Sequence, residues 1–472
     1  MSRGPSDPLL PRNSGEREPD RIAQLEQWDR EIVWHAFTQM AEYQPLLIER
    51  AVGCELIDAA GRRYLDGASS LWCNLHGHRH SRIDAAIREQ LDKVAHVTSL
   101  GLSNSTTIRL ARRLTQLAPS GLNHVFFSDN GATAVEVALK MAFQYWRQCS
   151  EPQPERRKFL AFANAYHGDT IGSVSLGGVE RFHAMFRPLL FDVIRVEAPD
   201  SYRLPKGIAP GDALPYYLGR FEQALRQHHR SLAAVVIEPL VQAAAGMLMH
   251  PPGFLRGVRE LTRQFGVPLI ADEVAVGFGR TGTLFACEQE QVAPDFLCLA
   301  KGLSAGYLPV AATLTSTAIW DAFLGSYADS RSFFHGHTYG GNPLGCAAAL
   351  ANLELFDEEQ TLAGLPPKIA LLRQHGRRLA ELPIVGDVRQ CGMIAAVELV
   401  RDRRLQQPFP WVERRGQAVC DLALRQGVWL RPLGNVVVIM PPLAISLEQL
   451  DKICTVVYDA ISRLSGDVQD GR

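Results

Sequence analysis

The sequence predicts an α/β fold in which a mainly parallel sheet is covered by helices on both faces, followed by a smaller α+β domain. From about residue 124 to 314, short apolar runs alternate with amphipathic segments. This alternation is typical of parallel sheets, because parallel strands need long crossovers that are usually helical. The length of 472 residues also indicates more than one domain.

Each apolar run in this part of the chain is short enough for a single buried strand. Between two of the runs, residues 132–147 form a helical pattern in which Val135, Ala138, Leu139 and Ala142 follow the i, i+3, i+4 rule. A second helical pattern covers residues 254–265. The predicted strands are residues 124–128, 159–162, 233–237, 268–271, 296–299 and 310–314.

The pattern changes after a helix rich in alanine and leucine, which is predicted over residues 344–356. Residues 386–389, 393–399 and 436–440 then form strand-like runs with helical segments beside them. These runs predict a smaller sheet in a C-terminal α+β domain.

The composition excludes several classes of protein. Apolar residues make up 46% and charged residues 21%, as in ordinary globular proteins. Lys and Arg number 49 against 50 Asp and Glu, so no net field favours nucleic acid or an acidic membrane. No apolar run is long enough to span a bilayer. We therefore expect a cytoplasmic protein without a nucleic-acid or membrane partner.

Nine cysteines are scattered along the chain without a Cys-x-x-Cys pair. An odd number and irregular spacing argue against a disulfide framework and against a zinc site. Two histidine clusters, at residues 76–80 and 335–337, lack a carboxylate or cysteine at ligand spacing. We expect reduced cysteines in the core and no metal.

Polar side chains follow two of the predicted strands. Lys301 comes directly after residues 296–299, and Asp272 ends the run that begins at Val267. In open α/β sheets, ligands bind at the carboxyl ends of the strands. A lysine amine can form a Schiff base with pyridoxal phosphate, and a carboxylate can keep its pyridine nitrogen protonated. The alternative is a lysine and an aspartate that only cap strands or pair as ions.

Three loops at predicted strand ends could also contact a ligand. Residues 128–133 lead into a helix whose backbone N–H groups could bind an anion, although an ordinary helix cap explains them equally well. Residues 164–170 place Tyr166 where it could stack on a flat ring or belong to the core. Residues 335–343 form a glycine-rich loop before a helix. None of these loops is a GxGxxG motif or a P-loop.

Taken together, these motifs resemble the class III aminotransferases of fold type I, which bind pyridoxal 5'-phosphate. The resemblance covers nearly the whole chain beyond about residue 30. Its most specific segments are residues 270–274, 277–282 and 301–302. Within the family, the chain resembles the branch that converts 8-amino-7-oxononanoate into 7,8-diaminononanoate in biotin synthesis. That narrower match rests on Trp34-His35, residues 66–70, Tyr145-Trp146, residues 166–169, 285–288 and 335–338, and Arg431-Pro432.

The resemblance implies a role for each candidate residue. Lys301 would carry the cofactor and move the proton, Asp272 would pair with the pyridinium, and Tyr166 would stack on the ring. The residues implied in catalysis are Lys301, Asp272 and Tyr166; those implied in cofactor binding are Gly131, Ala132, Tyr166, Asp272, Val274, Lys301, His337 and Thr338; those implied in substrate binding are Phe37, Leu71, Trp72, Tyr166, Lys301, Gly336 and Arg431.

The resemblance also implies the organisation of the molecule. Gly336, His337 and Thr338 would reach the phosphate of a neighbouring subunit, which implies a homodimer with active sites at the interface. The parts that we expect are a disordered tail over residues 1–20, an N-terminal segment over 21–70 that contributes to the small domain and the active-site entrance, a large cofactor-binding domain over 71–350 and a small C-terminal domain over 351–472.

The chain departs from the family pattern where the amino donor would bind. Members that use S-adenosylmethionine usually have Trp-His-Pro-Tyr and Ser-Ser-Trp-Trp, but this chain has Phe37 and Leu71 at the last and third positions of these motifs. A cation beside an aromatic face gains about 0.5 to 2 kcal/mol. Residues 37–40 and 69–72 resemble the branch that uses L-lysine. The donor, S-adenosylmethionine or L-lysine, is left open.

Two other functions are compatible with parts of the pattern. Another class III aminotransferase, acting on an ω-amino acid or a diamine, would share Asp272 and Lys301 and differ in acceptor specificity. A non-catalytic scaffold of the same fold would have no need for both residues.

Overall fold

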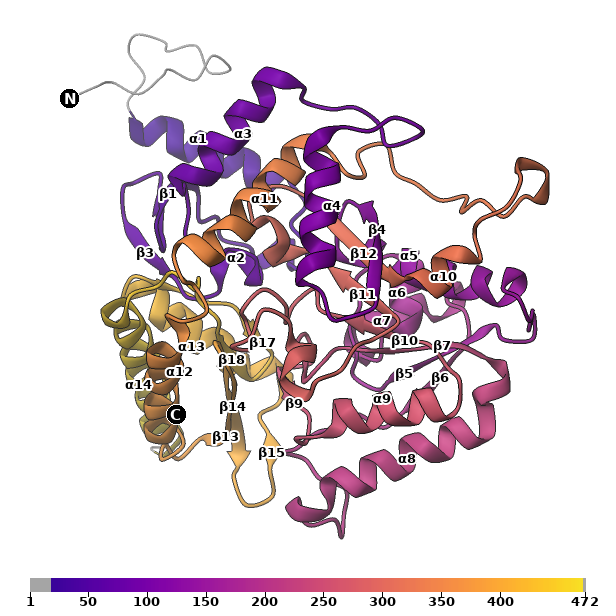
Figure 1. The fold of residues 1–472 in the computed structure, drawn as a ribbon. Helices are drawn as coiled ribbons and strands as arrows, with labels where there is room; N and C mark the ends of the chain where they lie inside the picture. The colour runs from indigo at the N-terminus through magenta and orange to yellow at the C-terminus, as the bar shows by residue number, and fades with distance from the viewer. Residues whose placement is uncertain (1–17, 470–472) are drawn as a thin grey trace.

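The computed structural model describes residues 18–469, and the chain folds into two unequal regions (Figure 1). Residues 1–17, which hold most of the expected disordered tail, lie outside the described residues. The first described element is α1 (Glu18–Ile32), so the last three residues of the expected tail belong to a helix.

A seven-stranded sheet forms the centre of the larger region. Its strands lie in the order β4 (Leu122–Ser128), β12 (Ala311–Ser316), β11 (Phe296–Leu299), β10 (Leu269–Asp272), β7 (Leu232–Ile237), β5 (Lys158–Phe162) and β6 (Val193–Val196). All six strands predicted in this region are therefore confirmed. The missed strand, β6, is a partly exposed edge strand with Arg195 in its middle, so it lacks an apolar run.

One strand runs against the others. β12 pairs antiparallel with both β11 and β4, and the remaining pairs in the sheet are parallel. The connection from β11 to β12 contains only a short 3-10 turn, η6 (Lys301–Ser304), without the helix that a parallel crossover usually needs. The chain therefore returns alongside β11, and the sheet is mainly but not wholly parallel.

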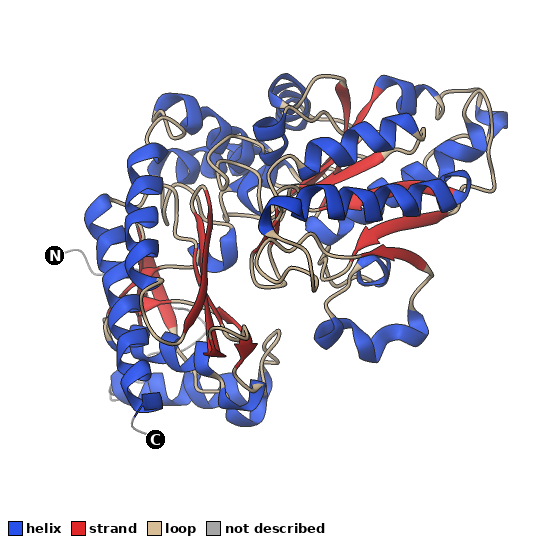
Figure 2. Cartoon of the chain, turned by 90° about the horizontal axis from the view of Figure 1, so that it is seen from below, coloured by secondary structure: helices blue, strands red, loops and turns tan. Residues whose placement is uncertain are grey.

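Helices cover both faces of this sheet (Figure 2). Helix α5 (Gly131–Gln148) packs on β7, β11 and β12, whereas α8 (Ala213–His228) packs with α9 (Phe254–Gln264). Successive strand residues belong to two different cores, because side chains alternate across a strand. Ile270 lies in the core beneath α5, and its neighbours Leu269 and Ala271 lie in the other.

The predicted helices over residues 132–147, 254–265 and 344–356 are confirmed as α5, α9 and α11 (Pro343–Glu358). Helix α11 packs against α3 (Ser81–Lys93) and α4 (Ser105–Leu117) of the larger region. The boundary expected near residue 350 thus falls inside α11, and the division by residue number stays a prediction.

The smaller region contains an antiparallel sheet with three long helices along one side (Figure 2). The predicted strands near residues 386, 393 and 436 are confirmed as β13, β14 and β18. The sheet contains β13 (Val385–Cys391), β14 (Ile394–Asp402), β18 (Val436–Ile439), β17 (Pro432–Leu433) and β15 (Gln407–Pro408), and the helices are α12 (Leu365–Leu379), α13 (Arg415–Arg425) and α14 (Leu447–Gln469).

The described residues form two further small sheets, of which the first joins distant parts of the chain. In the first, β16 (Val428–Trp429) pairs with β3 (Arg63–Asp66), which continues into β2 (Glu55–Asp58) and β1 (Ile48–Val52). The N-terminal segment is thus hydrogen-bonded to the smaller region. The second is a hairpin of β8 (Val241–Gln242) and β9 (Leu248–Met249).

Shorter helices complete the described chain. They are α6 (Ile171–Leu176), α7 (Glu180–His183) and α10 (Thr317–Asp321), whereas the segment labelled α2 (Ser69–Trp72) is a short turn with left-handed backbone angles. Within residues 18–469, no helix combines the length and apolar character needed to cross a bilayer. All nine cysteines are free thiols.

Candidate active site

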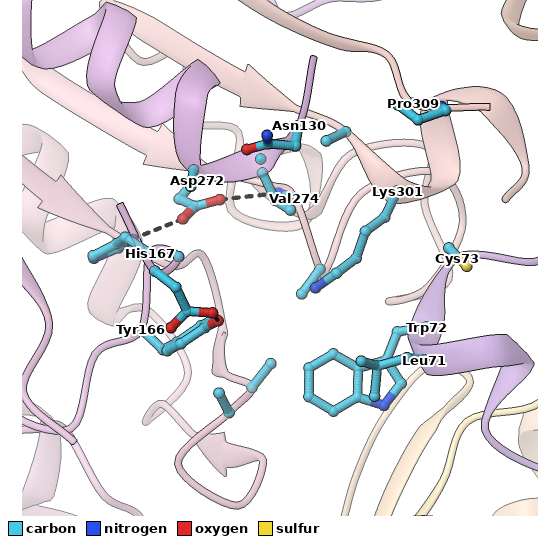
Figure 3. Close-up of a pocket in the computed structure, with 18 of the residues that line it drawn as sticks. Leu71, Trp72, Cys73, Asn130, Tyr166, His167, Asp272, Val274, Lys301 and Pro309 are labelled. Atoms are coloured by element: carbon cyan, nitrogen blue, oxygen red, sulfur yellow. Dashed lines mark hydrogen bonds and ion pairs between the residues drawn. The ribbon is translucent and has the colours of Figure 1, made fainter. Parts of the chain in front are cut away.

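A cavity of about 780 Å³ lies at the carboxyl edge of the seven-stranded sheet (Figure 3). Residues that follow β4, β5, β7, β10 and β11 all contribute to its wall. The opposite wall comes from the N-terminal segment and from residues 431 and 433 of the smaller region. The strand ends that the sequence singled out therefore meet in one cavity.

Lys301 is held in an unusual backbone conformation at the end of β11. Its φ of 44° is left-handed, which is uncommon for a non-glycine residue and marks many functional sites. The buried side chain of Asn352 holds the following turn by donating to the carbonyls of Gly302 and Leu303, both at 2.9 Å. The Lys301 amine faces the cavity, 4.9 Å from the centre of the Trp72 ring (Figure 3). Burial lowers the pKa of this amine, which favours the neutral, nucleophilic form.

Asp272 faces the same cavity from the end of β10. One carboxylate oxygen accepts a hydrogen bond from Nδ1 of His167 at 2.7 Å, and the other accepts from the backbone N–H of Val274 at 3.0 Å. Burial alone would lower the pKa of His167, but the hydrogen bond and charge of Asp272 raise this pKa above its usual value. The two hydrogen bonds fix the carboxylate of Asp272, and the raised pKa favours the protonated form of His167 beside it.

Glu273, the other half of the acidic pair in the sequence, points away from the cavity. It is fully buried and accepts from the backbone N–H groups of Ala286 and Cys287 at 2.7 and 2.8 Å. Burial raises the pKa of Glu273 to about 7. Its role is to hold the loop after Gly282 in place.

Glu238 links two walls of the cavity. Its carboxylate accepts from the backbone N–H of Tyr166 at 3.0 Å and from that of Ala243 at 2.9 Å. Burial raises the pKa of Glu238 to about 7. The Tyr166 hydroxyl donates to Asp169 at 2.6 Å, so the ring of this tyrosine is fixed at both ends.

The start of α5 forms a close-fitting cradle. Asn130 caps the helix by accepting from the backbone N–H of Thr133 at 3.1 Å. A Cβ atom on Gly131 would lie 2.5 Å from a methyl group of Val274, and one on Gly168 would lie 2.3 Å from Cβ of Ala132. Only glycine fits at these two positions. The exposed helix N–H groups and the helix dipole suit a phosphate at this end of the cavity.

The other end of the cavity is aromatic and has one cation. The ring of Phe37 packs edge-on against that of Phe182, with centroids 5.4 Å apart. The guanidinium carbon of Arg431 lies 5.8 Å from the centre of the Phe37 ring. Burial lowers the pKa of Arg431. In the described chain no carboxylate forms an ion pair with this arginine, so its guanidinium can receive an anionic group.

A left-handed turn carries two residues of this end. Ser69, Ser70, Leu71 and Trp72 have φ values of 45°, 48°, 66° and 71°. Left-handed geometry costs about 1–2 kcal/mol per residue, so such a run needs support from its surroundings. Buried Asp66 accepts from the backbone N–H and the hydroxyl of Ser70, both at 3.0 Å.

Arg280 supports the same turn from behind. This fully buried guanidinium donates to the hydroxyl of Ser69 at 2.8 Å and to the carbonyls of Asn74 and Pro441, each at 2.7 Å. Burial lowers the pKa of Arg280 to about 10, so it stays charged at neutral pH. The turn is therefore joined to the smaller region, which contributes Pro441.

The structure brings together ten of the thirteen candidate residues. The ten that line the cavity are Phe37, Leu71, Trp72, Gly131, Ala132, Tyr166, Asp272, Val274, Lys301 and Arg431. Gly336, His337 and Thr338 do not line it and lie in an exposed loop. His337 contacts the cavity indirectly, because its Nδ1 lies 2.6 Å from the carboxylate of Asp129.

Sequence reasoning missed four residues that shape the site. His167 lies within the loop of residues 164–170 and Glu238 directly follows the strand predicted over residues 233–237, so their polar character at strand ends was the available signal. Asn352 and Phe182 had no such signal, because their contacts with residues 302–303 and 37 bridge long stretches of chain.

The histidine clusters have partners that the spacing did not reveal. His80 lies 2.9 Å from Glu359, His76 lies 3.8 Å from the same carboxylate, and His78 lies 3.0 Å from Asp66. Across residues 18–469, no set of three or more histidine, cysteine or acidic side chains is arranged to bind a metal ion.

Comparison with known proteins identifies the class. Residues 37–461 match the family model described as aminotransferase class-III, and the chain belongs to this family. It is 54% identical to the adenosylmethionine-8-amino-7-oxononanoate aminotransferase of Nitratidesulfovibrio vulgaris over 96% of this chain and 84% of that protein. It is 52% identical to the protein of the same name from Geobacter sulfurreducens, over 95% of this chain and all of that one.

Solved structures agree with the fold. The crystal structure of adenosylmethionine-8-amino-7-oxononanoate aminotransferase from Methanocaldococcus jannaschii has a TM-score of 0.88 at 42% identity, over 93% of this chain and 99% of that one. An (S)-enantioselective omega-transaminase from Thermomicrobium roseum has a TM-score of 0.89 at 36% identity, over 94% and 98%. The predicted fold class, the fold-type I arrangement of a large domain and a smaller α+β domain, is confirmed.

The residues of the cavity fit pyridoxal phosphate, the predicted cofactor. Lys301 supplies the amine that would hold it, Asp272 with His167 suits its ring nitrogen, and the start of α5 suits its phosphate. The Gly131 and Gly168 cradle, which a Cβ atom would fill, independently supports a group that approaches the backbone closely.

Proposed function

We propose that this protein transfers an amino group to 8-amino-7-oxononanoate and forms 7,8-diaminononanoate in biotin synthesis. The observation that supports this most directly is a single cavity with Lys301 and Asp272 at one end and Arg431 at the other. The names of the relatives support the same acceptor. The expected cytoplasmic location remains a prediction.

Each residue of the cofactor end has a distinct task in this reaction. When bound, pyridoxal phosphate withdraws electrons from the carbon that carries the reacting amine. Asp272 would keep a proton on the ring nitrogen, and His167 would hold that carboxylate in place. Lys301 would hold the cofactor covalently and, once released, move a proton with its Nζ. Its lowered pKa suits the neutral amine that this step needs.

The acceptor has a long apolar chain that ends in a carboxylate, and the second end of the cavity suits it. Phe37, Phe182 and Trp72 offer aromatic surface, and Arg431 can bind the carboxylate through two parallel hydrogen bonds. Anchoring the far end would place the keto group beside Lys301. The same arrangement would exclude acceptors without a distal anion.

S-adenosylmethionine is the donor that the names of the relatives favour. L-lysine remains a second candidate because Phe37 and Leu71 line the cavity where a tyrosine hydroxyl and a second tryptophan ring would receive a sulfonium and an adenosine. Neither side chain offers a hydrogen bond to a nucleoside.

The half-reaction of the cofactor-loaded protein tests both the amino donor and the acceptor. We would mix the protein separately with each donor, follow the loss of the cofactor absorbance and then add the acceptor. We expect S-adenosylmethionine to bleach the band and 8-amino-7-oxononanoate to restore it. Bleaching by L-lysine but not by S-adenosylmethionine would identify L-lysine as the donor. Turnover of an ω-amino acid with pyruvate, but none with 8-amino-7-oxononanoate, would contradict the acceptor and favour the ω-transaminase alternative.

We also propose a homodimer with the active sites at its interface. Trp34, Leu100 and Tyr327 are 89%, 88% and 99% exposed, which is unusual for large apolar side chains. The loop of residues 336–338 is exposed as well and could reach a partner's phosphate site. Sedimentation should give twice the 52.2 kDa chain mass, and a stable monomer with full activity would contradict the proposal.

A further inference from the structure

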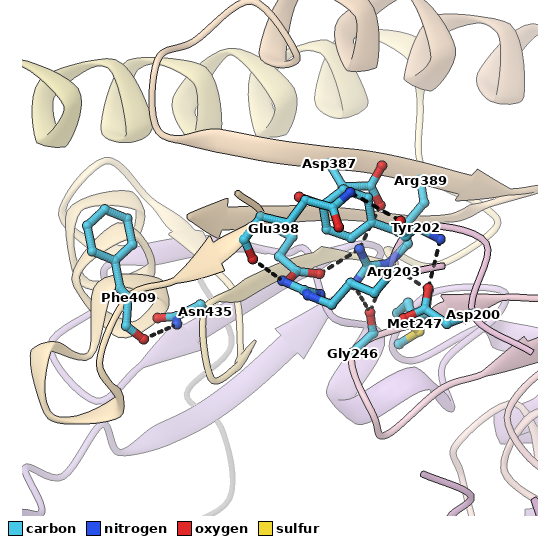
Figure 4. Close-up of polar contacts among 11 residues, drawn as sticks. Asp200, Tyr202, Arg203, Gly246, Met247, Asp387, Arg389, Glu398, Phe409 and Asn435 are labelled. Carbon is cyan, nitrogen blue, oxygen red and sulfur yellow. Dashed lines mark hydrogen bonds and ion pairs between the residues drawn. The ribbon is translucent and has the colours of Figure 1, made fainter. Parts of the chain in front are cut away.

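A network of charged side chains, centred on the buried Arg389 and Glu398, joins the two regions of the molecule (Figure 4). At its centre, Arg389 donates from Nη1 to Glu398 at 2.8 Å and to Asp387 at 2.7 Å. Arg203 forms a further ion pair with the other oxygen of Glu398. Two positive and two negative charges therefore balance.

The small sheet arranges three of these side chains. Asp387 and Arg389 lie two residues apart on β13, so they share one face of the sheet. Glu398 on β14 is directly opposite Asp387 in the antiparallel register. Although burial opposes the charged form of Glu398, the hydrogen bond of Arg203 and the charge of Arg389 lower its pKa, which keeps it ionised.

The remaining donors of Arg389 cross to the larger region. Nε donates to the carbonyl of Met247 at 2.8 Å and to that of Gly246 at 3.1 Å, and Nη2 also donates to Gly246. These carbonyls belong to the loop of the β8–β9 hairpin. A Cβ atom on Gly246 would lie 3.2 Å from Val436 and 3.5 Å from Arg389, so the two regions are in close contact here.

The hairpin loop has its other face on the cavity. Ala243 and Ala244 line the cavity, and the N–H of Ala243 is held by Glu238, which also holds Tyr166. Met247 is fully buried in a core cluster that also contains Trp72, Val436 and Ile394. The loop is thus fixed between Glu238 of the larger region and Arg389 of the smaller one.

The sheet that carries Arg389 also carries the candidate substrate anchor. β14 pairs with β18, β18 pairs with β17, and Arg431 directly precedes β17. A bond that fixes β13 and β14 against the hairpin therefore also fixes where the edge of this sheet, with Arg431, lies relative to Lys301.

We propose that Arg389 is a positioning residue: by clamping the hairpin loop to the small sheet, it sets the distance between the carboxylate anchor Arg431 and the amine of Lys301. The proposal deepens the function proposed above and rests on the role of Arg431 as that anchor. Its consequence is that Arg389, which does not line the cavity, controls selectivity for substrates with a distal carboxylate.

Binding of two matched probes to the cofactor-loaded protein tests this inference. Nonanoate carries the carboxylate at the end of an apolar chain, and nonanamide has the same chain without the charge. We expect Arg389→Met to weaken nonanoate binding about 10-fold in calorimetry and to leave nonanamide binding unchanged, as networks that couple sites typically shift binding by this order. A purely structural role would weaken both probes equally, and that result would overturn the proposal.

Two further variants act as controls. Asp387→Asn removes a partner of Arg389 that does not touch the hairpin, so we expect less than about a 2-fold change. Arg389→Lys keeps the charge, but its three N–H donors on one atom are too few for both carboxylates and both carbonyls, so it should fall between the wild type and Arg389→Met. Arg389→Lys also provides the test if Arg389→Met does not fold. Nonanoate binding by Arg389→Lys at the wild-type level would overturn the proposal.

Hydrogen exchange gives a readout that does not depend on ligand binding. In Arg389→Met, amides 243–247 should exchange faster, whereas amides of β10 and β11 should not change. If amides 243–247 exchanged at the same rate in Arg389→Met as in the wild type, the proposal would be overturned. Transamination of 8-amino-7-oxononanoate by the wild type reports separately on the proposed function, so failure of that function is distinguishable from failure of the positioning role.

Discussion

The two ends of the cavity are built in different ways. The cofactor end consists of residues that follow neighbouring strands of one sheet, such as Asp272 after β10 and Lys301 after β11. The substrate end combines Phe37, the left-handed turn of residues 69–72, Phe182 and Arg431, which come from four distant parts of the chain. The first end is held mainly at one sheet edge, whereas the second needs the two regions to be docked correctly.

This difference suggests a division of labour. A rigid sheet edge holds the groups that every aminotransferase reaction requires, because covalent and proton-transfer steps tolerate little displacement. Loops from several elements decide which substrates enter, and they can change without disturbing the chemistry. The resemblance to both biotin-pathway enzymes and ω-transaminases agrees with this division.

Replacement of Lys301 should have the largest effect and should affect every substrate. Lys301→Ala removes the amine that holds the cofactor and moves the proton, so we expect a loss of at least about 10³-fold in turnover and of the cofactor's bound absorbance. Spectroscopy and half-reaction rates with each donor would measure this. Lys158→Ala, at the start of β5, is the matched control. An active Lys301→Ala variant would contradict the assignment of the cofactor end.

Replacement of Arg431 should instead affect the substrate end and leave the cofactor end unchanged. In Arg431→Met, kcat/KM for 8-amino-7-oxononanoate should fall about 10- to 100-fold, because hydrogen bonds to a charged group contribute about 1.5–3 kcal/mol. Binding of the cofactor should not change. Steady-state kinetics and cofactor titration would test this, with Arg425→Met on α13 as the control. An equal loss of cofactor binding would mean that the ends are not independent.

Asp66 tests whether the left-handed turn is maintained by its surroundings. Asp66→Asn replaces one acceptor oxygen with an NH₂ group that cannot accept from Ser70 or His78, so we expect a loss of about 1–3 kcal/mol in the free energy of unfolding. KM for the acceptor should rise several-fold while the cofactor absorbance stays. Chemical denaturation and kinetics would measure both effects, and an unchanged stability would show that the turn does not depend on this carboxylate.

A pH-dependent effect is expected at Glu238, whose carboxylate accepts from the backbone N–H groups of Tyr166 and Ala243. Burial raises the pKa of Glu238 to about 7 from a usual 4.5, so the folded state binds this proton more tightly than the unfolded state. The resulting stabilisation is complete below pH 4.5 and is lost as pH rises through 7. The difference in unfolding free energy between the wild type and Glu238→Gln should therefore decrease over this range, by about 3 kcal/mol at most.

Denaturation at several pH values would measure this difference. Glu151→Gln, at an exposed position, is the control and should track the wild type. A difference that stays constant with pH would contradict the raised pKa of Glu238.

Much of the cofactor end could be predicted because its signals are local. Each apolar run gave its strand, and parallel strands bring their carboxyl ends to one edge, so Asp272 and Lys301 had to be close. Sequence alone did not show where the neighbouring Glu273 points, because its partners, the backbone N–H groups of Ala286 and Cys287, lie further along the chain. It also did not reveal the reversed β12, because only the structure shows that residues 300–310 form no crossover helix between β11 and β12.

The sequence by itself determined the mainly parallel sheet, the strand-end position of Lys301 and Asp272, and the family, because these depend on short-range patterns and on motifs in a fixed order. Only the tertiary structure decided that Asp272 pairs with His167, that residues 69–72 form a left-handed turn, and that Arg389 reaches the hairpin beside the cavity. Those contacts join segments far apart in the chain. Their geometry follows from how the two regions pack, which no local pattern records.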